Sequence, residues 1–138
     1  MTIDASRTAL DSYVAVSPLL LLAEDNEANI KTLADYLEVK GYRVVVARTG
    51  VEAIKLARKV TPDMIVMDIQ MPELDGLEAT RRIRADAELM HIPIIAVTAL
   101  AMPGDRERCL AAGANAYLSK PISLKALVSV LAEHRITF

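Results

Sequence analysis

Three acidic side chains directly follow short apolar runs, where carboxylates could do chemistry. Asp68 ends the run 65–67, and Glu24 and Asp25 follow the run 19–23. A carboxylate at the end of a buried strand costs free energy unless a partner neutralises or uses it. Taken alone, each acid is explained equally well as a helix cap.

A hydroxyl and an ammonium group occupy comparable positions later in the chain. Thr98 ends the run 94–97, and Lys120 lies between the run 116–118 and Pro121. Singly, these are an ordinary strand threonine and a solvated loop lysine. If the runs are parallel strands of one open sheet, however, all these side chains meet at its carboxyl edge.

Such a group of side chains favours phosphoryl transfer. Clustered carboxylates repel one another, and Mg²⁺ relieves the repulsion by binding a few carboxylates while keeping several waters. An aspartate carboxylate can accept a phosphoryl group covalently. Positive charge and hydrogen-bond donors around the transferred oxygens then stabilise the reaction.

The elements that must position these residues alternate between strand and helix patterns. Apolar runs of strand length occupy residues 19–23, 43–47, 64–67, 94–97 and 116–118. Nearly uniform apolar strands indicate burial on both faces of a parallel sheet. A helical pattern follows each run, so five βα units predict a doubly wound α/β fold with helices on both faces.

Local signals mark where the helices begin and end. Thr49 and Glu52 have the spacing of a capping box, and Asp75 and Ser123 are further candidate helix starts. Pro103 is expected in the first turn of the fourth helix, where proline is tolerated.

The composition restricts the classes of protein to consider. The chain has 138 residues, 53% of them hydrophobic, and a net charge of −2. This charge gives no support to direct nucleic-acid binding, and no run approaches the roughly 18–20 apolar residues that span a membrane.

A single cysteine, Cys109, fits a reducing compartment. Residues 1–17 do not resemble a signal peptide and are expected to be an N-terminal extension or linker, so a cytoplasmic location is expected.

Several other side chains are expected to be structural. Met64 and Met67 are expected in the core. Arg81, Arg82 and Arg84 are expected on a solvated helix face.

Four motifs in order, LLAEDN, MDIQMPELDG, IPIIAVTALA and AYLSKP, closely resemble the receiver domain of two-component response regulators. The resemblance covers about residues 18–136. One such motif is weak, but four in register are highly specific. MDIQMP…DGLEATRRIR resembles receivers of hybrid sensor histidine kinases and single-domain response regulators. The resemblance implies a flavodoxin-like (βα)5 fold whose parallel strands lie in the order 2-1-3-4-5.

The resemblance also implies roles in a phosphorelay. Asp68 is expected to accept a phosphoryl group from a phosphohistidine, with Mg²⁺ or Mn²⁺ as cofactor. Asp25, Asp68 and the backbone carbonyl of Gln70 are expected metal ligands. Glu24 is expected to hold the metal through water, with Glu in place of the more usual Asp. Whether the Gln70 side chain also tunes autodephosphorylation stays open.

Other residues are expected to bind the phosphoryl group and to transmit its presence. Thr98 and the amide of Ala99 resemble the groups that bind phosphate oxygens, and Lys120 resembles the ion-pairing lysine, with a cis bond to Pro121. Thr98 and Tyr117 are the expected switch residues. The expected readout is the face made by the fourth helix, fifth strand and fifth helix, about residues 103–135.

The expected partners are a histidine kinase or a histidine phosphotransfer protein. Direct nucleic-acid contact and membrane insertion of this segment are not expected, and the readout face is a candidate surface for a homodimer. The chain is expected to promote its own phosphotransfer and autodephosphorylation without being an enzyme for a separate substrate.

Three alternatives belong to other classes. An aspartate-based phosphohydrolase usually carries a second Asp two residues after its nucleophile, where this chain has Gln70. A flavodoxin-like cofactor binder needs a Ser/Thr/Gly-rich loop after the first strand, where this chain has Glu24-Asp25-Asn26-Glu27. A pure interaction module would not need the intact set of site residues.

Overall fold

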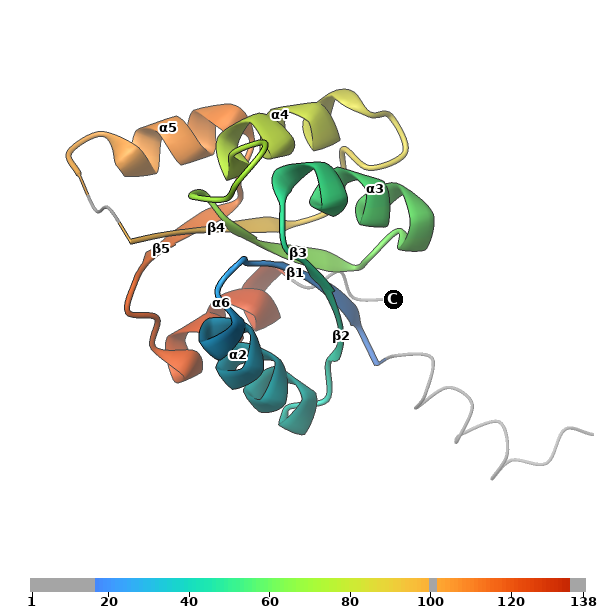
Figure 1. The fold of residues 1–138 in the computed structure, drawn as a ribbon, viewed down its shortest axis with the longest axis vertical. Coiled ribbons are helices and arrows are strands. Elements are labelled where there is room, and N and C mark those ends of the chain that lie inside the picture. Colours follow the sequence, from blue (N-terminus) through green and yellow to red (C-terminus); the bar gives the residue numbers. More distant parts are fainter. Residues whose placement is uncertain (1–16, 100–101, 135–138) are drawn as a thin grey trace, which may run out of the picture.

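Five short parallel strands form the centre of the molecule (Figure 1). The computed structural model describes residues 17–99 and 102–134. The strands are β1 (Leu19–Ala23), β2 (Arg43–Ala47), β3 (Met64–Asp68), β4 (Ile94–Thr98) and β5 (Ala116–Ser119). They lie in the order β2-β1-β3-β4-β5, which confirms the predicted topology.

Helices cover both faces of this sheet. They are α2 (Glu27–Val39), α3 (Gly50–Val60), α4 (Gly76–Ala85), α5 (Asp105–Ala112) and α6 (Leu124–His134). Figure 1 shows α2 and α6 on one face, and α3, α4 and α5 on the other. The predicted doubly wound, flavodoxin-like fold is therefore confirmed. Within the described residues, no helix is long and apolar enough to cross a membrane.

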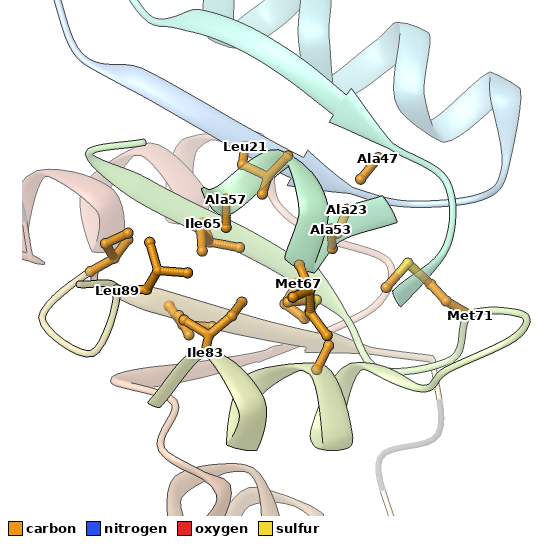
Figure 2. Packing of buried hydrophobic residues seen from close by; sticks show 14 residues of the cluster. Leu21, Ala23, Ala47, Ala53, Ala57, Ile65, Met67, Met71, Ile83 and Leu89 are labelled. Carbon is orange, nitrogen blue, oxygen red and sulfur yellow. The ribbon is translucent and has the colours of Figure 1, made fainter. Parts of the chain in front are cut away.

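The two faces of the sheet bury two separate apolar clusters, because successive strand residues point to opposite faces. Ile65 and Met67 of β3 pack in the cluster beneath α3 and α4 (Figure 2). Met64 and Val66 pack in the cluster on the other face, together with residues such as Leu127 of α6. Burial on both faces explains why the strands read as unbroken apolar runs.

Side-chain caps fix the starts of four helices. The Thr49 hydroxyl accepts a hydrogen bond from the Glu52 amide at 3.0 Å, as the capping-box spacing predicts. Asp75 and Ser123 cap α4 and α6 in the same way, at 2.9 and 3.2 Å. Asn26, which directly follows the acidic pair after β1, caps α2.

The start of α5 differs from the prediction. The helix begins at Asp105 and not around Pro103. Gly104 has φ of +88°, a left-handed conformation that cannot continue a right-handed helix. The Asp105 carboxylate accepts a hydrogen bond from the Met102 amide, which closes the preceding turn.

The predicted solvated face of α4 is wrong for one of its arginines. Arg81 and Arg82 are exposed, but Arg84 is only partly exposed. Its guanidinium donates hydrogen bonds to the Gly113 carbonyl at 2.8 Å and to the Asn115 side chain at 2.7 Å. Arg84 therefore ties α4 to the loop that precedes β5.

The predicted boundaries of the domain fall at the edges of the described chain. Of the N-terminal extension predicted for residues 1–17, residues 1–16 lie outside the described residues, as do residues 135 and 136 at the predicted end of the domain.

Candidate functional site

The carboxyl ends of the strands meet at one edge of the sheet. β1 is paired with β3, β3 with β4, and β4 with β5, all in parallel register. Asp68 is the last residue of β3, Glu24 directly follows β1, and Lys120 directly follows β5. The sequence prediction that these three side chains converge is therefore confirmed.

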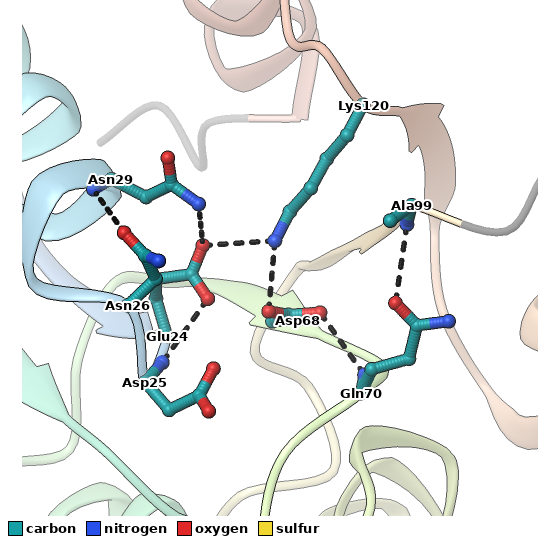
Figure 3. A network of polar contacts seen from close by, with 8 residues as sticks. All are labelled: Glu24, Asp25, Asn26, Asn29, Asp68, Gln70, Ala99 and Lys120. Atoms are coloured by element: carbon teal, nitrogen blue, oxygen red, sulfur yellow. Dashed lines mark hydrogen bonds and ion pairs between the residues drawn. The ribbon is translucent and has the colours of Figure 1, made fainter.

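The ammonium group of Lys120 bridges two buried carboxylates (Figure 3). Its Nζ lies 2.9 Å from Oδ2 of Asp68 and 2.9 Å from Oε1 of Glu24. The backbone fixes the start of this side chain: the Lys120 amide donates to the Thr98 carbonyl at 2.8 Å, and the bond to Pro121 is cis, as the resemblance implied. The positive charge between the two acids offsets part of the free-energy cost of burying them.

Further hydrogen bonds hold the Glu24 carboxylate in place. The side-chain amide of Asn29 donates to Oε1 at 3.0 Å, and the Asp25 backbone amide donates to Oε2 at 3.1 Å. Asn29 was not among the site residues predicted from the sequence. Its place in the first turn of α2, five residues after Glu24, was the only signal for this contact.

The acidic side chains form a group that fits a divalent cation. Glu24, Asp25 and Asp68 each offer a carboxylate oxygen, and these oxygens all lie within 4.8 Å of one another. Glu24 and Asp68 are buried, whereas Asp25 is exposed and leaves the group open to solvent. Oxygen donors of this kind suit Mg²⁺, which prefers one or two carboxylates plus waters.

Burial and mutual repulsion change the acidity of this group. Burial, together with its contact to Glu24, raises the pKa of Asp68 to about 7, although Lys120 and the Gln70 amide act in the opposite direction. Burial also acts to raise the pKa of Glu24, but its contacts with Asp68, Lys120 and Asn29 outweigh burial and lower it. Without a cation, Asp68 is thus the acid that retains a proton near neutrality.

The remaining predicted residues lie at different distances from this network. Thr98 is buried at the end of β4. The amide of Ala99 donates to the side-chain oxygen of Gln70 at 3.4 Å, a contact that the sequence did not predict. Tyr117 lies outside the network and packs, half-buried, on the apolar cluster that contains Cys109.

A cleft of about 540 Å³ adjoins the bridged carboxylates. Glu24 and Lys120 contribute to its polar part, and Leu33, Ile122 and Leu124 are among its apolar lining residues. Glu24 follows β1, and Leu33 belongs to α2. Lys120 and Ile122 lie between β5 and α6, and Leu124 is the first residue of α6. A partner group in this cleft would therefore lie next to the acidic cluster.

Comparison with known proteins identifies the family. The model of the response regulator receiver domain matches residues 20–132. The polar-differentiation response regulator DivK of Brucella ovis is 49% identical over 112 residues, which cover 81% of this chain and 91% of that protein.

Solved structures agree with this result. The receiver domain of sensor histidine kinase PA1611 from Pseudomonas aeruginosa, which has a magnesium ion coordinated in its active-site cleft, is 42% identical with a TM-score of 0.79; the match covers 86% of this chain and 97% of that one. Chemotaxis protein CheY4 of Vibrio cholerae is 27% identical with a TM-score of 0.80, covering 86% and 98%. The chain therefore belongs to the response regulator receiver domain family and functions in two-component phosphorelay signalling.

Proposed function

We propose that Asp68 is the phosphoacceptor of this receiver. The observation that carries the proposal is the placement of Lys120, whose ammonium group contacts both Asp68 and Glu24 at 2.9 Å from a loop far away in sequence. Of the acids in the cluster, Asp68 has one oxygen held by this ammonium group and the other by the Gln70 amide at 3.0 Å. Both contacts orient the carboxylate for attack on phosphorus.

The transfer step forms one bond and breaks one. A carboxylate oxygen of Asp68 attacks the phosphorus of a phosphohistidine, and the phosphorus–nitrogen bond breaks with its electron pair left on the imidazole. Lys120, the Thr98 hydroxyl and the Ala99 amide would surround the transferred oxygens. In autodephosphorylation a water oxygen attacks the same phosphorus, and the bond from phosphorus to the Asp68 oxygen breaks with its electron pair left on the carboxylate. Inorganic phosphate leaves with the protons of the water.

The acidic cluster is the proposed site for Mg²⁺ or Mn²⁺. Asp25, Asp68 and the backbone carbonyl of Gln70 would hold the ion directly, and Glu24 would hold it through water. The three neighbouring carboxylates support this assignment. When bound, the ion supplies positive charge that offsets the acids and the phosphoryl oxygens.

A histidine kinase or a histidine phosphotransfer protein is the proposed donor, docked over the cleft beside Lys120. The apolar wall of Leu33, Ile122 and Leu124 offers packing surface for such a partner, and the acidic cluster lies directly beside it. Neither direct nucleic-acid contact nor membrane insertion is part of the proposal.

Phosphorylation is proposed to act through Thr98 and Tyr117. The added negative charge attracts the Thr98 hydroxyl, and the half-buried Tyr117 on the neighbouring strand moves in response. The readout is the face made by α5, β5 and α6, which is also the proposed surface for a homodimer.

The wider setting is also a proposal. The receiver domain is taken to span residues 18–136, with residues 1–17 as an extension or linker, in the cytoplasm. The protein promotes its own phosphotransfer and autodephosphorylation and does not act on a separate substrate. Single-domain response regulators and receivers of sensor histidine kinases both occur among its relatives.

Intact-mass measurement tests the phosphoacceptor. With Mg²⁺ and acetyl phosphate, the wild-type protein should gain one phosphoryl group that is stable in acid and labile in base, and Asp68→Asn should gain none. Omitting Mg²⁺ should abolish the gain. An equal adduct on Asp68→Asn would refute the assignment, and steady phosphate release without an adduct would favour a phosphohydrolase.

A further inference from the structure

Gln70 makes one hydrogen bond with the Asp68 carboxylate and a second one with a neighbouring backbone amide. Its backbone amide donates to Oδ1 of Asp68 at 3.0 Å, and its side-chain oxygen accepts a hydrogen bond from the Ala99 amide at 3.4 Å. Figure 3 shows this side chain spanning the opening between the loop after β3 and the end of β4. The side chain of Gln70 therefore accepts the hydrogen bond of the Ala99 amide, which lies next to the proposed phosphoacceptor.

The occupied amide is one that the transferred phosphoryl group needs. Ala99 directly follows Thr98, and β4 is the strand beside β3, with Val97 opposite Asp68. A backbone N–H at this position can donate to a phosphoryl oxygen on Asp68. One N–H makes one good hydrogen bond at a time, so the Gln70 oxygen and a phosphoryl oxygen compete for it.

We propose that the Gln70 carboxamide is a displaceable cap on the Ala99 amide that slows phosphorylation of Asp68. The inference rests on the proposed function, and it makes Gln70 a positioning residue that acts through Ala99. The cap must leave before the amide can stabilise the transferred group.

The geometry indicates a weak contact that a phosphoryl group can displace. The Gln70 residue is exposed, and its 3.4 Å contact is longer than the common range for a hydrogen bond between N–H and oxygen. The carboxamide oxygen is neutral, whereas phosphoryl oxygens are charged and accept shorter and stronger hydrogen bonds. The cap therefore affects the rate of phosphorylation and does not prevent it.

The effect appears in the transfer step itself. With acetyl phosphate as donor, an Asp68 oxygen attacks phosphorus, the bond from phosphorus to the acetate oxygen breaks, and acetate leaves with the electron pair. As charge builds on the phosphoryl oxygens, the Ala99 amide exchanges its Gln70 partner for one of them. In a variant without the cap, the Ala99 amide can donate to a phosphoryl oxygen without first losing its hydrogen bond to Gln70.

Two variants of Gln70 separate hydrogen bonding from bulk. Gln70→Met keeps the length of the side chain and loses the strong acceptor, whereas Gln70→Ala loses both. Because the side chain is exposed, both variants should fold, which circular dichroism checks. The backbone carbonyl of Gln70 is retained in both, so the proposed metal ligands are unchanged.

Initial rates of phosphorylation by acetyl phosphate and Mg²⁺, followed by intact mass, give the first readout. Both variants should be phosphorylated about two- to tenfold faster than wild type, the range that one neutral hydrogen bond supports. A faster Gln70→Ala with an unchanged Gln70→Met would assign the effect to bulk and overturn the proposal. Unchanged or slower rates in both variants would overturn it as well.

Hydrogen exchange of the Ala99 amide, measured by NMR without phosphate or metal, gives the second readout. The cap predicts faster exchange of this amide in both variants than in wild type, and equal exchange overturns the proposal. This measurement does not depend on phosphorylation. A wild-type protein that forms no adduct on Asp68 refutes the proposed function, whereas an adduct with no change in amide exchange refutes the cap alone.

Discussion

At the residue scale, the position of Lys120 determines how much negative charge the site can carry. Its ammonium group lies between Glu24 and Asp68, at 2.9 Å from each. One positive charge cannot balance both of these acids and the neighbouring Asp25. Burial, and after it the contact with Glu24, raises the pKa of Asp68. The surplus negative charge is the reason why a divalent cation suits the site.

The raised pKa predicts how the stability of the metal-free protein depends on pH. Asp68 has a pKa of about 7 in the folded protein and about 3.9 in the unfolded chain. Between these values the folded protein keeps a proton that the unfolded chain has released, so the free energy of unfolding falls as pH rises. Asp68→Asn has no titratable group at this position, so at pH 8 it should be more stable than wild type by up to about 4 kcal/mol.

Urea unfolding of both proteins in a chelator, followed by circular dichroism between pH 5 and pH 8.5, measures this difference. The advantage of Asp68→Asn should grow through the window and level off above pH 7. Lys31→Met, which removes an exposed charge whose ion-pair partner is Asp35, should show no such trend. A difference between wild type and Asp68→Asn that stays constant with pH would contradict the assignment of the raised pKa to Asp68.

At the element scale, two helix starts are pressed against the loop that follows β3. A Cβ atom added to Gly76 at the start of α4 would overlap the carbonyl oxygen of Asp68, and one added to Gly50 at the start of α3 would overlap that of Leu74. These contacts involve backbone, which cannot move aside as a flexible side chain does. The glycines therefore set how closely the helices approach the Asp68 loop.

Gly76→Ala should both destabilise the protein and disturb the site. Overpacking against backbone is expected to cost about 1–3 kcal/mol in the free energy of unfolding. Because the obstructed atom belongs to Asp68 itself, the affinity for Mg²⁺ should also fall, as measured by calorimetry.

Gly41→Ala is the matched control for this change. Gly41 lies just after the end of α2, whereas Gly76 begins α4. The φ of Gly41 is +97°, and nothing lies within 4 Å of an added Cβ. Gly41→Ala should lower the free energy of unfolding by about 1 kcal/mol through backbone strain and leave the affinity for Mg²⁺ unchanged. Equal loss of Mg²⁺ affinity in both variants would show that stability, and not local geometry, controls the site.

The same elements show how far the sequence alone predicts the fold and the site. Strands and most helix starts were predictable because their signals are local: apolar runs, and caps such as Thr49 and Asp75. Convergence of the strand-end residues followed from the parallel sheet. The left-handed Gly104 moved the start of α5, and the partners of Arg84 lie in separate loops, so neither feature was visible in a local pattern.

The contacts of two polar side chains at the site could likewise not be predicted from the sequence. Asn29 and the side chain of Gln70 reach groups on other elements, at Glu24 and Ala99 respectively. Residue type shows that an amide can make such contacts, but only the assembled sheet and loops determine which partner is within reach. Helix caps are therefore predictable from local sequence, whereas contacts between separate elements are not.

At the scale of the whole molecule, the acidic cluster exists only when the sheet is assembled. Glu24 follows β1 and Asp68 ends the neighbouring strand β3. Lys120 reaches both from the loop after the edge strand β5, 96 residues after Glu24 in the chain. The unfolded chain does not hold these groups together. A cation that binds the cluster therefore binds the folded state and stabilises the whole domain.

Mg²⁺ should consequently raise the free energy of unfolding by about 1.4 kcal/mol at a concentration ten times its dissociation constant. The gain should be larger at pH 8 than at pH 6, because below its pKa of about 7 the Asp68 carboxyl must first lose a proton. Urea unfolding with and without Mg²⁺, followed by circular dichroism, measures both effects in a chain that has no tryptophan. Asp25→Asn removes an exposed member of the cluster without opening the core and should lose most of the gain. If Mg²⁺ stabilised Asp25→Asn as strongly as wild type, the ion would be acting elsewhere on the surface, and the cluster would have no claim to be the metal site.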